Sequence, residues 1–460
     1  MRPSRRDVLK LLGAGAGAVA AGCGGGGPRG RVGIVGGGAA GVMTAWLLDG
    51  VYDTVVLEAG AALGGNAQTV EVDVRGQPAH VDMGPQYFHP GPYPRYAKLV
   101  ELVGLGDDVY AAPSSITIFA PGEANPRFVS PILPDRVWPL QQDWNTPGVD
   151  AFTALTRQAI DDDQQDHDWD ETVDAFLARL SLTDDQRTKI LLPWIASIAG
   201  VDLAITRGWS ARAALVFLAR ATTSLLETVQ YQTMRHGMQG VLDALAAACT
   251  TMTARTGSAV TAVTREASGQ LTVRTADGLT DTFDEVVVAA PAHAAIGFLG
   301  GLAGAEAAVA ALGRIEWTDA RLLLHRDPAY APADPMMQSF LNCWAGDTVC
   351  EASMRMASAL APLADGQPVD LWKSWASFRA ADPKEIVHET SFRHVSITPQ
   401  THDAQVALRA LSGQGHLWFA GGWSQEFDSQ ETCLASALAI AAGLDASSSA
   451  HSKALAAVTG

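Results

Sequence analysis

The stretch RVGIVGGGAAGVMTAWLLDG, residues 31–50, decides the fold. It reads as an apolar strand, a tight glycine turn and a helix, and TVVLEAG, residues 54–60, reads as a second strand that ends in an acid. The glycines fit the spacing G-x-G-x-x-G as Gly36, Gly38 and Gly41. That spacing alone is a weak signal in a chain with 45 glycines, but its strand–turn–helix context predicts a dinucleotide-binding unit.

Each glycine of this turn has a physical task. Gly36 makes the turn out of the strand, Gly38 lets the backbone approach a pyrophosphate because it has no Cβ, and Gly41 lets the helix pack closely on the strand. Ala39 and Ala40 follow in the first turn of the helix, whose free N–H groups would face the phosphates. The alternative interpretation is a glycine turn with a structural role only.

The acid at the end of the second strand supports the dinucleotide interpretation. Glu58 lies about 20 residues beyond the glycine turn, where an acid accepts hydrogen bonds from a ribose. Together these features predict the binding unit, but they do not decide between NAD and FAD as its ligand.

Residues 1–30 are set apart from the fold as an export signal, a lipoprotein cleavage box and a flexible tether. The segment Ser4 to Lys10 resembles a twin-arginine motif, and the glycine-rich run after it is too short to form a membrane-spanning helix. The segment Ala20 to Cys23 resembles a cleavage box, with Ala20 where leucine is usual. It predicts a lipid on Cys23 that anchors a periplasmic or envelope protein to a membrane surface. The alternative is a disordered basic tail.

Composition sets the broad class of the chain. The 460 residues carry 49 acidic and 32 basic side chains, a net charge of −17, which disfavours nucleic acid as a partner because phosphate binding needs a positive surface. With 48% hydrophobic residues the chain can form a large core. After the N-terminal segment, no run of 18 apolar residues predicts a transmembrane helix.

Metal and thiol sites have little support in the sequence. No C-x-x-C motif occurs, and Cys343 and Cys350 can either pair outside the cytoplasm or remain buried thiols. The acidic run from Asp161 to Glu171 contains His167 and permits a metal site, but a solvated loop and helix start is the favoured interpretation. We therefore predict no metal.

The pattern along the chain predicts an α/β protein. TVEVDV, HVDMG and then residues 258–290 alternate as strands, whereas residues 91–234 are mostly helical and include a capping box of Thr183 and Gln186. Residues 416–444 predict a strand, a Gly-Gly turn, a loop and a closing helix.

This layout resembles the superfamily of FAD-dependent amine oxidases and phytoene desaturases. It is most similar to the bacterial branch of FAD-binding oxidoreductases that includes fatty-acid double-bond isomerases. The resemblance covers most of residues 31–444 and rests on the glycine unit, on Glu58-Ala59-Gly60 and on Leu63-Gly64-Gly65. The pair Gly64-Gly65 favours FAD over NAD, since by resemblance its bare backbone lies along the cofactor.

The resemblance implies a Rossmann-like FAD-binding domain of the glutathione-reductase type with an inserted α+β substrate domain. Residues 31–90, 235–298 and 400–446 would form the FAD-binding domain. Residues 91–234 and 299–399 would form the substrate domain.

The resemblance also assigns positions along the cofactor. Val260 lies in a strand whose backbone meets the adenine, Ala290 lies near the adenine ribose, and Gly421-Gly422 lies beside the pyrophosphate and ribityl chain. The helix opening at Glu431-Thr432 would aim its N-terminus at the flavin and stabilise its anionic reduced form. The full set of predicted FAD contacts is Gly36, Gly38, Ala39, Ala40, Gly41, Glu58, Ala59, Gly64, Gly65, Asn66, Gly84, Pro85, Gln86, Val260, Ala290, Gly421, Gly422, Glu431 and Thr432.

Three departures from the family pattern bear on this site. Asn66 stands where relatives often have arginine or histidine, which affects one phosphate or flavin contact. Gly422 stands where many relatives have an acid that binds ribityl hydroxyls. The stretch Gln425 to Gln430 is more polar than its counterpart in the isomerase-like branch. These changes bear more on the substrate than on the cofactor.

Candidate catalytic residues come from two loops. The loop Asp82 to Phe88 follows a strand and by resemblance passes near the isoalloxazine ring, so Gln86 and Tyr87 are candidates to bound the reacting face. Trp423 follows the C-terminal glycines and is a candidate to face the substrate. For both aromatic residues, packing in the core is the alternative.

Two further side chains enter as candidates. His394 can hydrogen-bond to substrate or flavin, but a structural histidine is the favoured interpretation. Lys373 can mimic the lysine that some amine oxidases place near flavin N5, but its context LWKSW does not match that segment.

The leading hypothesis is an exported FAD-dependent oxidoreductase that takes a hydride from a substrate C–H bond to flavin N5, with reoxidation by oxygen or another acceptor. The donor would be a small amine, an amino-acid derivative or a lipid-like alkyl chain. The first alternative is a flavin-dependent double-bond isomerase or desaturase, which a long apolar tunnel through residues 91–234 would favour. The second is a non-catalytic, flavin-binding envelope lipoprotein.

Overall fold

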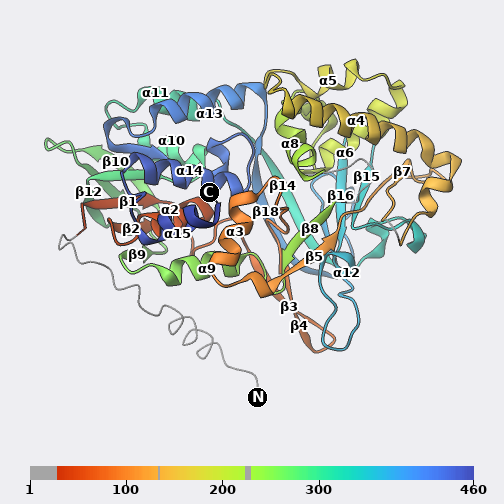
Figure 1. The fold of residues 1–460 in the computed structure, drawn as a ribbon, viewed down its shortest axis with the longest axis horizontal. Coiled ribbons are helices and arrows are strands. Elements are labelled where there is room, and N and C mark those ends of the chain that lie inside the picture. The colour runs from red at the N-terminus through yellow and green to blue at the C-terminus, as the bar shows by residue number, and fades with distance from the viewer. Residues whose placement is uncertain (1–27, 133–134, 223–228, 460) are drawn as a thin grey trace.

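The computed structural model describes residues 28–132, 135–222 and 229–459. The predicted export signal and the lipidation site Cys23 lie outside the described residues. Figure 1 shows two lobes side by side, one around a parallel sheet and one around a larger mixed sheet. Among the helices that the structure describes, none is long and apolar enough to cross a membrane.

The first lobe is built on a five-stranded parallel sheet in the order β19-β13-β1-β2-β9. Side chains of the central strand β1 alternate between two cores: Val32 and Ile34 pack on one face, and Val35 packs on the other. Both faces are covered, which explains why this strand reads as a continuous apolar run. The strands are β1 (Arg31–Val35), β2 (Asp53–Leu57), β9 (Met252–Arg255), β13 (Glu285–Val288) and β19 (Leu417–Phe419).

Helices cover one face of this sheet, and helices with a small sheet cover the other (Figure 1). The first face carries α2 (Ala39–Leu48), α3 (Pro94–Leu102), α9 (Gln239–Ala248), α14 (Gln430–Gly443) and α15 (Ala450–Thr459). The second carries α10 (Ala292–Leu299), α11 (Glu306–Leu312), α13 (Pro399–Leu411), β10 (Val260–Arg265), β11 (Leu271–Thr275) and β12 (Thr280–Phe283). Because α2 and α14 pack against each other, the two ends of the chain meet beside β1.

The second lobe is built on a seven-stranded sheet in the order β18-β14-β17-β16-β15-β6-β7, antiparallel except for the pair β15–β6. Its strands are β6 (Ile116–Phe119), β7 (Phe128–Val129), β14 (Glu316–His325), β15 (Leu341–Ala345), β16 (Cys350–Arg355), β17 (Trp372–Trp375) and β18 (Ile386–Ser396). A helical layer packs against it, made of α4 (Thr146–Gln164), α5 (Val173–Arg179), the π-helix η4 (Gln186–Leu191), α6 (Leu192–Ser197), α7 (Leu203–Arg207) and α8 (Ala211–Ala221).

Short elements connect the two lobes. Two antiparallel pairs accompany the sheets: the hairpin of β3 (Thr69–Val74) and β4 (Gln77–Asp82), at the bottom of Figure 1, and β5 (Val109–Pro113) with β8 (Gln230–Met234), whose strands lie far apart in the sequence. The remaining elements are α12 (Met356–Ala359) and the 3₁₀ turns η1 (Gly106–Asp108), η2 (Trp138–Gln141), η3 (Asp143–Asn145), η5 (Pro328–Tyr330), η6 (Pro335–Met337), η7 (Gln414–His416) and η8 (Gly422–Ser424).

The predicted α/β class with a parallel sheet is confirmed. All five parallel strands fall within residues 31–90, 235–298 and 400–446. All seven strands of the mixed sheet fall within residues 91–234 and 299–399. The domain boundaries themselves stay a prediction.

Two parts of the sequence interpretation need correction. Residues 91–234 are less helical than predicted, because they contain β5, β6, β7 and β8. These strands are two to five residues long, too short to show alternation, and β6 finds its partner β15 far along the chain. In addition, α14 does not close the chain, since α15 follows it and packs on α2 and α3.

The predicted capping box at the start of η4 is present. Thr183 and Gln186 form the reciprocal bonds of a capping box: the Thr183 N–H donates to Gln186 Oε1 at 2.9 Å, and the Gln186 N–H donates to Thr183 Oγ1 at 3.2 Å.

Cys343 and Cys350 are buried free thiols on β15 and β16, so of the two alternatives for this pair the structure shows the unpaired thiols.

Candidate active site

The glycine turn after β1 requires glycine at two positions. Gly36 has a φ of +110°, and a Cβ there would lie 2.7 Å from the backbone of Ala289 and Ala290. A Cβ on Gly41 would lie 2.0 Å from the carbonyl oxygen of Gly36. The glycine turn therefore packs closely against the end of β13 and against the first turn of α2, as predicted for Gly36 and Gly41.

The second glycine pair lies directly on the first turn. The Gly64 N–H donates to the carbonyl oxygen of Gly37 at 2.9 Å, and Gly38 forms an isolated bridge with Gly64. A Cβ on Gly65 would lie 2.9 Å from Gly38 Cα, whereas a Cβ on Gly38 would meet only Gly65 Cα, at 3.7 Å. The two bare backbones thus form a cradle at the N-terminus of α2.

Glu58 fixes the shape of this cradle. Its Oε2 accepts a hydrogen bond from the Gly37 N–H at 2.7 Å, and its Oε1 accepts one from the Gly60 N–H at 2.6 Å. Its own carbonyl accepts from the Ser258 N–H at 2.8 Å. A carboxylate has about four acceptor positions, so capacity for ribose hydroxyls remains. The ribose contact of Glu58 and the role of the exposed Ala59 stay predictions.

The other predicted contacts that precede the C-terminal glycine turn lie on several elements. Val260 and Ala290 are partly buried against the core beneath the parallel sheet. Asn66 is exposed, and its carbonyl oxygen lies 1.8 Å from where a Cβ on Gly84 would stand, so the loops around these two residues touch. Pro85 follows in the same loop. Their cofactor contacts also stay predictions.

The C-terminal glycine turn leads into α14. Gly421 has a φ of +146°, and its N–H donates to Ser436 Oγ at 3.1 Å. Ser429 and Thr432 form a capping box at the start of α14, with N–H to oxygen distances of 3.1 and 3.0 Å. The predicted helix start is confirmed, and the Thr432 hydroxyl is used by the cap.

Glu431 and Trp423 have structural partners that the sequence did not reveal. Glu431 Oε2 accepts from the N–H groups of Arg95 and Tyr96 at 3.1 and 2.8 Å, so its carboxylate caps α3. Trp423 is 6% exposed, packs in the core beneath the parallel sheet, and its Nε1 lies 2.3 Å from where a Cβ on Gly421 would stand. This is the packing alternative for Trp423, and its predicted role toward substrate stays untested.

A buried lysine lies between the two lobes. Lys373, on β17, is 5% exposed, and its Nζ donates to the carbonyl oxygen of Asp82 at 2.6 Å and to Gln86 Oε1 at 2.8 Å. Burial lowers the pKa of Lys373 to about 8, against the opposing effect of Asp82. The structure therefore brings the predicted residue Gln86 together with a lysine whose sequence context gave it little support.

The carboxyl of Asp82 completes this cluster. Its Oδ1 accepts from Thr69 Oγ1 at 2.5 Å and from the Met238 N–H at 2.9 Å. Burial raises its pKa to about 6. Within the described parts of the chain, neither Asp82 Oδ2 nor Gln86 Nε2 has a hydrogen-bond partner. Buried polar atoms without partners are uncommon and point to a bound group.

Aromatic rings pack beside the lysine cluster. Tyr87 stacks on Tyr231 with 4.4 Å between ring centroids and 19° between planes, and Phe340 lies edge-on to Tyr87 at 5.6 Å. Burial raises the pKa of both tyrosine hydroxyls, so both are neutral phenols at physiological pH. We call the whole series the aromatic row: Phe340, Tyr87, Tyr231, Phe217, Tyr93 and Phe427.

His394 lies on β18 near the same loop. Its ring meets Trp375 edge-on at 5.3 Å, and burial lowers its pKa to about 4, so the imidazole is neutral. Its Nε2 is buried and has no partner among the residues that the structure describes. His394 therefore does not have the full set of hydrogen bonds expected of a structural histidine, and its contact with substrate or flavin stays a prediction.

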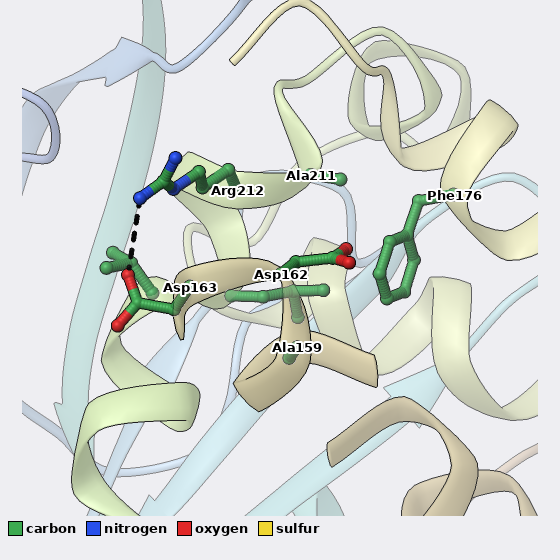
Figure 2. Close-up of a pocket in the computed structure, with 8 residues that line it drawn as sticks. Ala159, Asp162, Asp163, Phe176, Ala211 and Arg212 are labelled. Carbon is green, nitrogen blue, oxygen red and sulfur yellow. Dashed lines mark ion pairs between the residues drawn. The ribbon is translucent and has the colours of Figure 1, made fainter. Parts of the chain in front are cut away.

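Figure 2 shows a hollow in the helical layer of the second lobe, between α4, α5 and α8. Asp163 pairs there with Arg212, with 3.6 Å between Oδ1 and Nη2. Phe176 closes one side, and Asp162 points toward it. The hollow is lined by the Asp163–Arg212 ion pair, the carboxylate of Asp162 and apolar side chains, and none of these lining residues belongs to the predicted site.

The acidic run borders this hollow. The potential ligand atoms of Asp162, His167 and Glu171 lie within 4.8 Å of one another. However, the guanidinium of Arg179 already pairs with Asp162 and, at 2.8 Å, with Glu171. This arrangement favours a structural ion-pair network over a metal site.

Comparison with known proteins assigns the chain to a protein family. The model of a family described as flavin containing amine oxidoreductase matches residues 39–317, more than half of the chain. The chain belongs to this family. It is accordingly an FAD-dependent oxidoreductase. A search of curated proteins finds no match.

Two solved structures are similar to this flavoprotein in fold. One is a provisionally assigned protoporphyrinogen oxidase from Exiguobacterium sp. 255-15, with 16% identity, a TM-score of 0.61 and coverage of 91% of this chain and 100% of that one. The other is a CLA-producing fatty acid isomerase from P. acnes, with 15% identity, a TM-score of 0.60 and coverage of 89% and 97%. At these identities the likeness concerns the fold alone.

The residues present fit the flavin cofactor of the family. The bare cradle of Gly38 and Gly65 lies at the N-terminus of α2, where backbone N–H groups favour a pyrophosphate. Gln86 and Gln430 are each 5% exposed and each carry a side-chain nitrogen with no partner in the described ranges. These features lie at both glycine turns and at the lysine cluster, where one extended cofactor would satisfy them.

Proposed function

We propose that this flavoprotein takes a hydride from a C–H bond of a small amine-like substrate beside the Lys373–Gln86 cluster. When bound, FAD supplies the hydride acceptor and later passes the electrons to oxygen or another acceptor. The observation that supports the proposal is a buried lysine, with a lowered pKa, hydrogen-bonded to the loop predicted to border the flavin. We also propose that the parallel-sheet lobe is an FAD domain of the glutathione-reductase type.

The residues of the cluster would have separate tasks. Lys373 holds the Gln86 side chain in place and, with a pKa of about 8, is partly neutral near physiological pH, so it can hold or release a proton beside the substrate. The Gln86 amide nitrogen has no partner among the described residues, so it can donate a hydrogen bond. Tyr87 and its neighbours exclude water with their rings.

A double-bond isomerase acting on a lipid-like substrate is the second candidate. The aromatic row supports it, because the rings follow one another from the loop of Tyr87 through Phe217 of α8 to Phe427. An apolar chain would pack along such a wall without needing a charged partner.

Anaerobic mixing with each donor class tests these proposals. The purified holoenzyme is mixed without oxygen with a panel of primary amines or with an unsaturated fatty acid, and the visible absorption of the flavin is followed. Bleaching by an amine supports the oxidase proposal. Fatty-acid isomerisation without net bleaching supports the second candidate, and neither effect with FAD still bound supports a non-catalytic flavin-binding protein.

We further propose export by the twin-arginine route and lipidation of Cys23, on the motif at Ser4 to Lys10 and the box before Cys23. Cell fractionation of the full chain tests both steps. Replacement of Arg5 and Arg6 by lysine is expected to retain the FAD-loaded protein in the cytoplasm. Cys23→Ala is expected to release the exported protein from membranes.

A further inference from the structure

The C-terminal turn holds a carboxylate that neither the family resemblance nor the cluster around Lys373 explains. Asp428 lies just before the capping box of α14, and its Oδ1 lies 2.0 Å from where a Cβ on Gly422 would stand. The missing side chain at Gly422 therefore leaves room that the carboxylate of Asp428 fills.

The carboxylate of Asp428 lies against the backbone of the C-terminal turn. Burial raises the pKa of this carboxyl to about 6. Nevertheless Asp428 is exposed, with over a third of its surface open to a solvent-sized molecule. A carboxyl can have both a pKa raised by burial and an exposed surface when its side chain lines an internal hollow. Among the described residues, none donates a hydrogen bond to its carboxylate.

The neighbours of Asp428 place it between the two glycine turns. Cys433, one turn into α14, interacts with Asp428, and its thiol lies against the backbone N–H groups of Gly422 and Ala40. Ala40 belongs to the first turn of α2, which forms the cradle. Asp428 therefore lies near the point where the N-terminal ends of α2 and α14 meet, and not at the lysine cluster on β17.

A second polar group lies at the same place. Gln430, the first residue of α14, is 5% exposed, and its Nε2 has no partner in the part of the chain that the structure describes. An unpaired acceptor and an unpaired donor two residues apart match a ligand that carries several hydroxyls. In FAD such hydroxyls lie on the ribityl chain, between the pyrophosphate and the flavin ring.

We infer that Asp428 accepts hydrogen bonds from the ribityl hydroxyls of FAD, with Gln430 as a neighbouring donor. The carboxylate of Asp428 then supplies the acceptor that glycine at position 422 lacks. This contact concerns retention of the cofactor, and it holds or fails independently of which substrate the enzyme oxidises.

The contact predicts a pH dependence with a defined sign. Hydroxyl donors favour the ionised carboxylate, so FAD affinity falls as pH drops below the pKa of about 6 that Asp428 has without them. Two groups that face Asp428 do not titrate there, because burial raises the pKa of Cys433 to about 12 and also raises the pKa of the Tyr93 hydroxyl. Burial raises the pKa of the Glu431 carboxyl on α14 as well, but this carboxyl is bonded to Arg95 and the start of α3 and stays in place in Asp428→Asn, so a comparison of that variant with wild type separates the two acids.

The test compares FAD retention in three forms of the purified holoenzyme: wild type, Asp428→Asn and Glu426→Gln. Each is diluted in steps, and released FAD is followed by its fluorescence to give a dissociation constant at pH 7.5 and at pH 5. Asp428→Asn is expected to weaken FAD binding about tenfold or more at pH 7.5, the scale of a lost hydrogen bond to a charged group. Glu426→Gln removes a nearby acid of the same loop and is the matched control.

The pH series separates this role from a structural one. Wild type and Glu426→Gln are expected to lose about tenfold in FAD affinity between pH 7.5 and pH 5, and Asp428→Asn is expected to show a nearly flat profile over that range. If Asp428→Asn does not fold, a wild-type affinity that stays flat between these pH values overturns the inference by itself.

Two results for a folded Asp428→Asn would also overturn it. The first is FAD retention equal to that of wild type at both pH values. The second is unchanged retention with loss of substrate-driven bleaching, which would place the carboxylate at the substrate. A flavoprotein that keeps the predicted FAD profile but is bleached by no donor would contradict the proposed function and leave this inference supported.

Discussion

Lys373 shows how one residue joins the two lobes of the molecule. Its register on β17 is set by pairing with Leu324 of β14 and Met354 of β16, and its Nζ reaches the loop that follows β4. The exclusion of water lowers the pKa of this amine, whereas the nearby Asp82 carboxyl opposes the shift. Such a perturbed lysine, beside a predicted cofactor loop, is a candidate for proton handling.

Replacing this lysine tests the role directly. Lys373→Met keeps the length of the side chain and removes the amine, and it is expected to slow donor-driven bleaching about 100-fold or more. In wild type the bleaching rate is expected to rise as pH passes about 8, where Lys373 loses its proton. In Lys373→Met, the bleaching rate is expected to depend on pH only through the protonation of the donor itself. Stopped-flow absorbance measures both, and Lys384→Met, at an exposed position, is the control.

Gly38 offers a second test at the scale of one residue. Its φ of −75° suits alanine, and an added Cβ would make only an ordinary contact of 3.7 Å with Gly65, so Gly38→Ala is expected to fold. The same Cβ would stand in the cradle and is expected to weaken FAD binding at least tenfold by blocking the pyrophosphate. Gly297→Ala, in α10 with open space around it, is the matched control. Normal FAD binding by Gly38→Ala would contradict the assigned cradle.

At the scale of elements, α14 organises both the core and the site. It packs along α2, its capping box orders the turn that carries Asp428, and Glu431 from its first turn caps α3. The N-terminal ends of α2 and α14 therefore meet with their backbone N–H groups close together, and their positive dipole ends favour an anionic ligand.

The cap of α14 is expected to contribute measurable stability. Ser429→Ala removes the acceptor for the Thr432 N–H and is expected to lower the free energy of unfolding by about 1 kcal/mol. Urea titration followed by circular dichroism measures the change. Ser448→Ala, at an exposed position after α14, is expected to leave the free energy of unfolding within about 0.5 kcal/mol of wild type.

The sequence predicted elements whose signals are local. The unit β1–α2–β2, the pair β3–β4 and the start of α14 have strong apolar patterns or turn residues, and each occurs in the structure. The strands of residues 91–234 escaped prediction because they are short and their partners lie far along the chain. Lys373 was undervalued and Asp428 was missed for the same reason, since register on β17 and the space beside Gly422 decide where these side chains lie.

At the scale of the whole molecule, the predicted cofactor cradle draws on both ends of the chain, and the proposed substrate site draws on the mixed sheet through Lys373. The parallel sheet takes strands from three separate stretches, so the predicted FAD site would be complete only after β19 and α14 have joined β1 and α2. FAD is expected to stabilise this arrangement, because a ligand that binds only the folded state adds to the free energy of unfolding. Thermal denaturation with and without added FAD checks this, and an unchanged melting temperature at saturating FAD would contradict it.

The central claim is that this flavoprotein oxidises a C–H bond of an amine-like donor beside Lys373. The most direct measurement is anaerobic mixing of the holoenzyme with a panel of primary amines while the visible flavin absorption is recorded. We expect bleaching that saturates with amine concentration, is reversed by oxygen and is strongly slowed in Lys373→Met. A flavin that stays oxidised with every amine, or a Lys373→Met variant that bleaches at the wild-type rate, would contradict it.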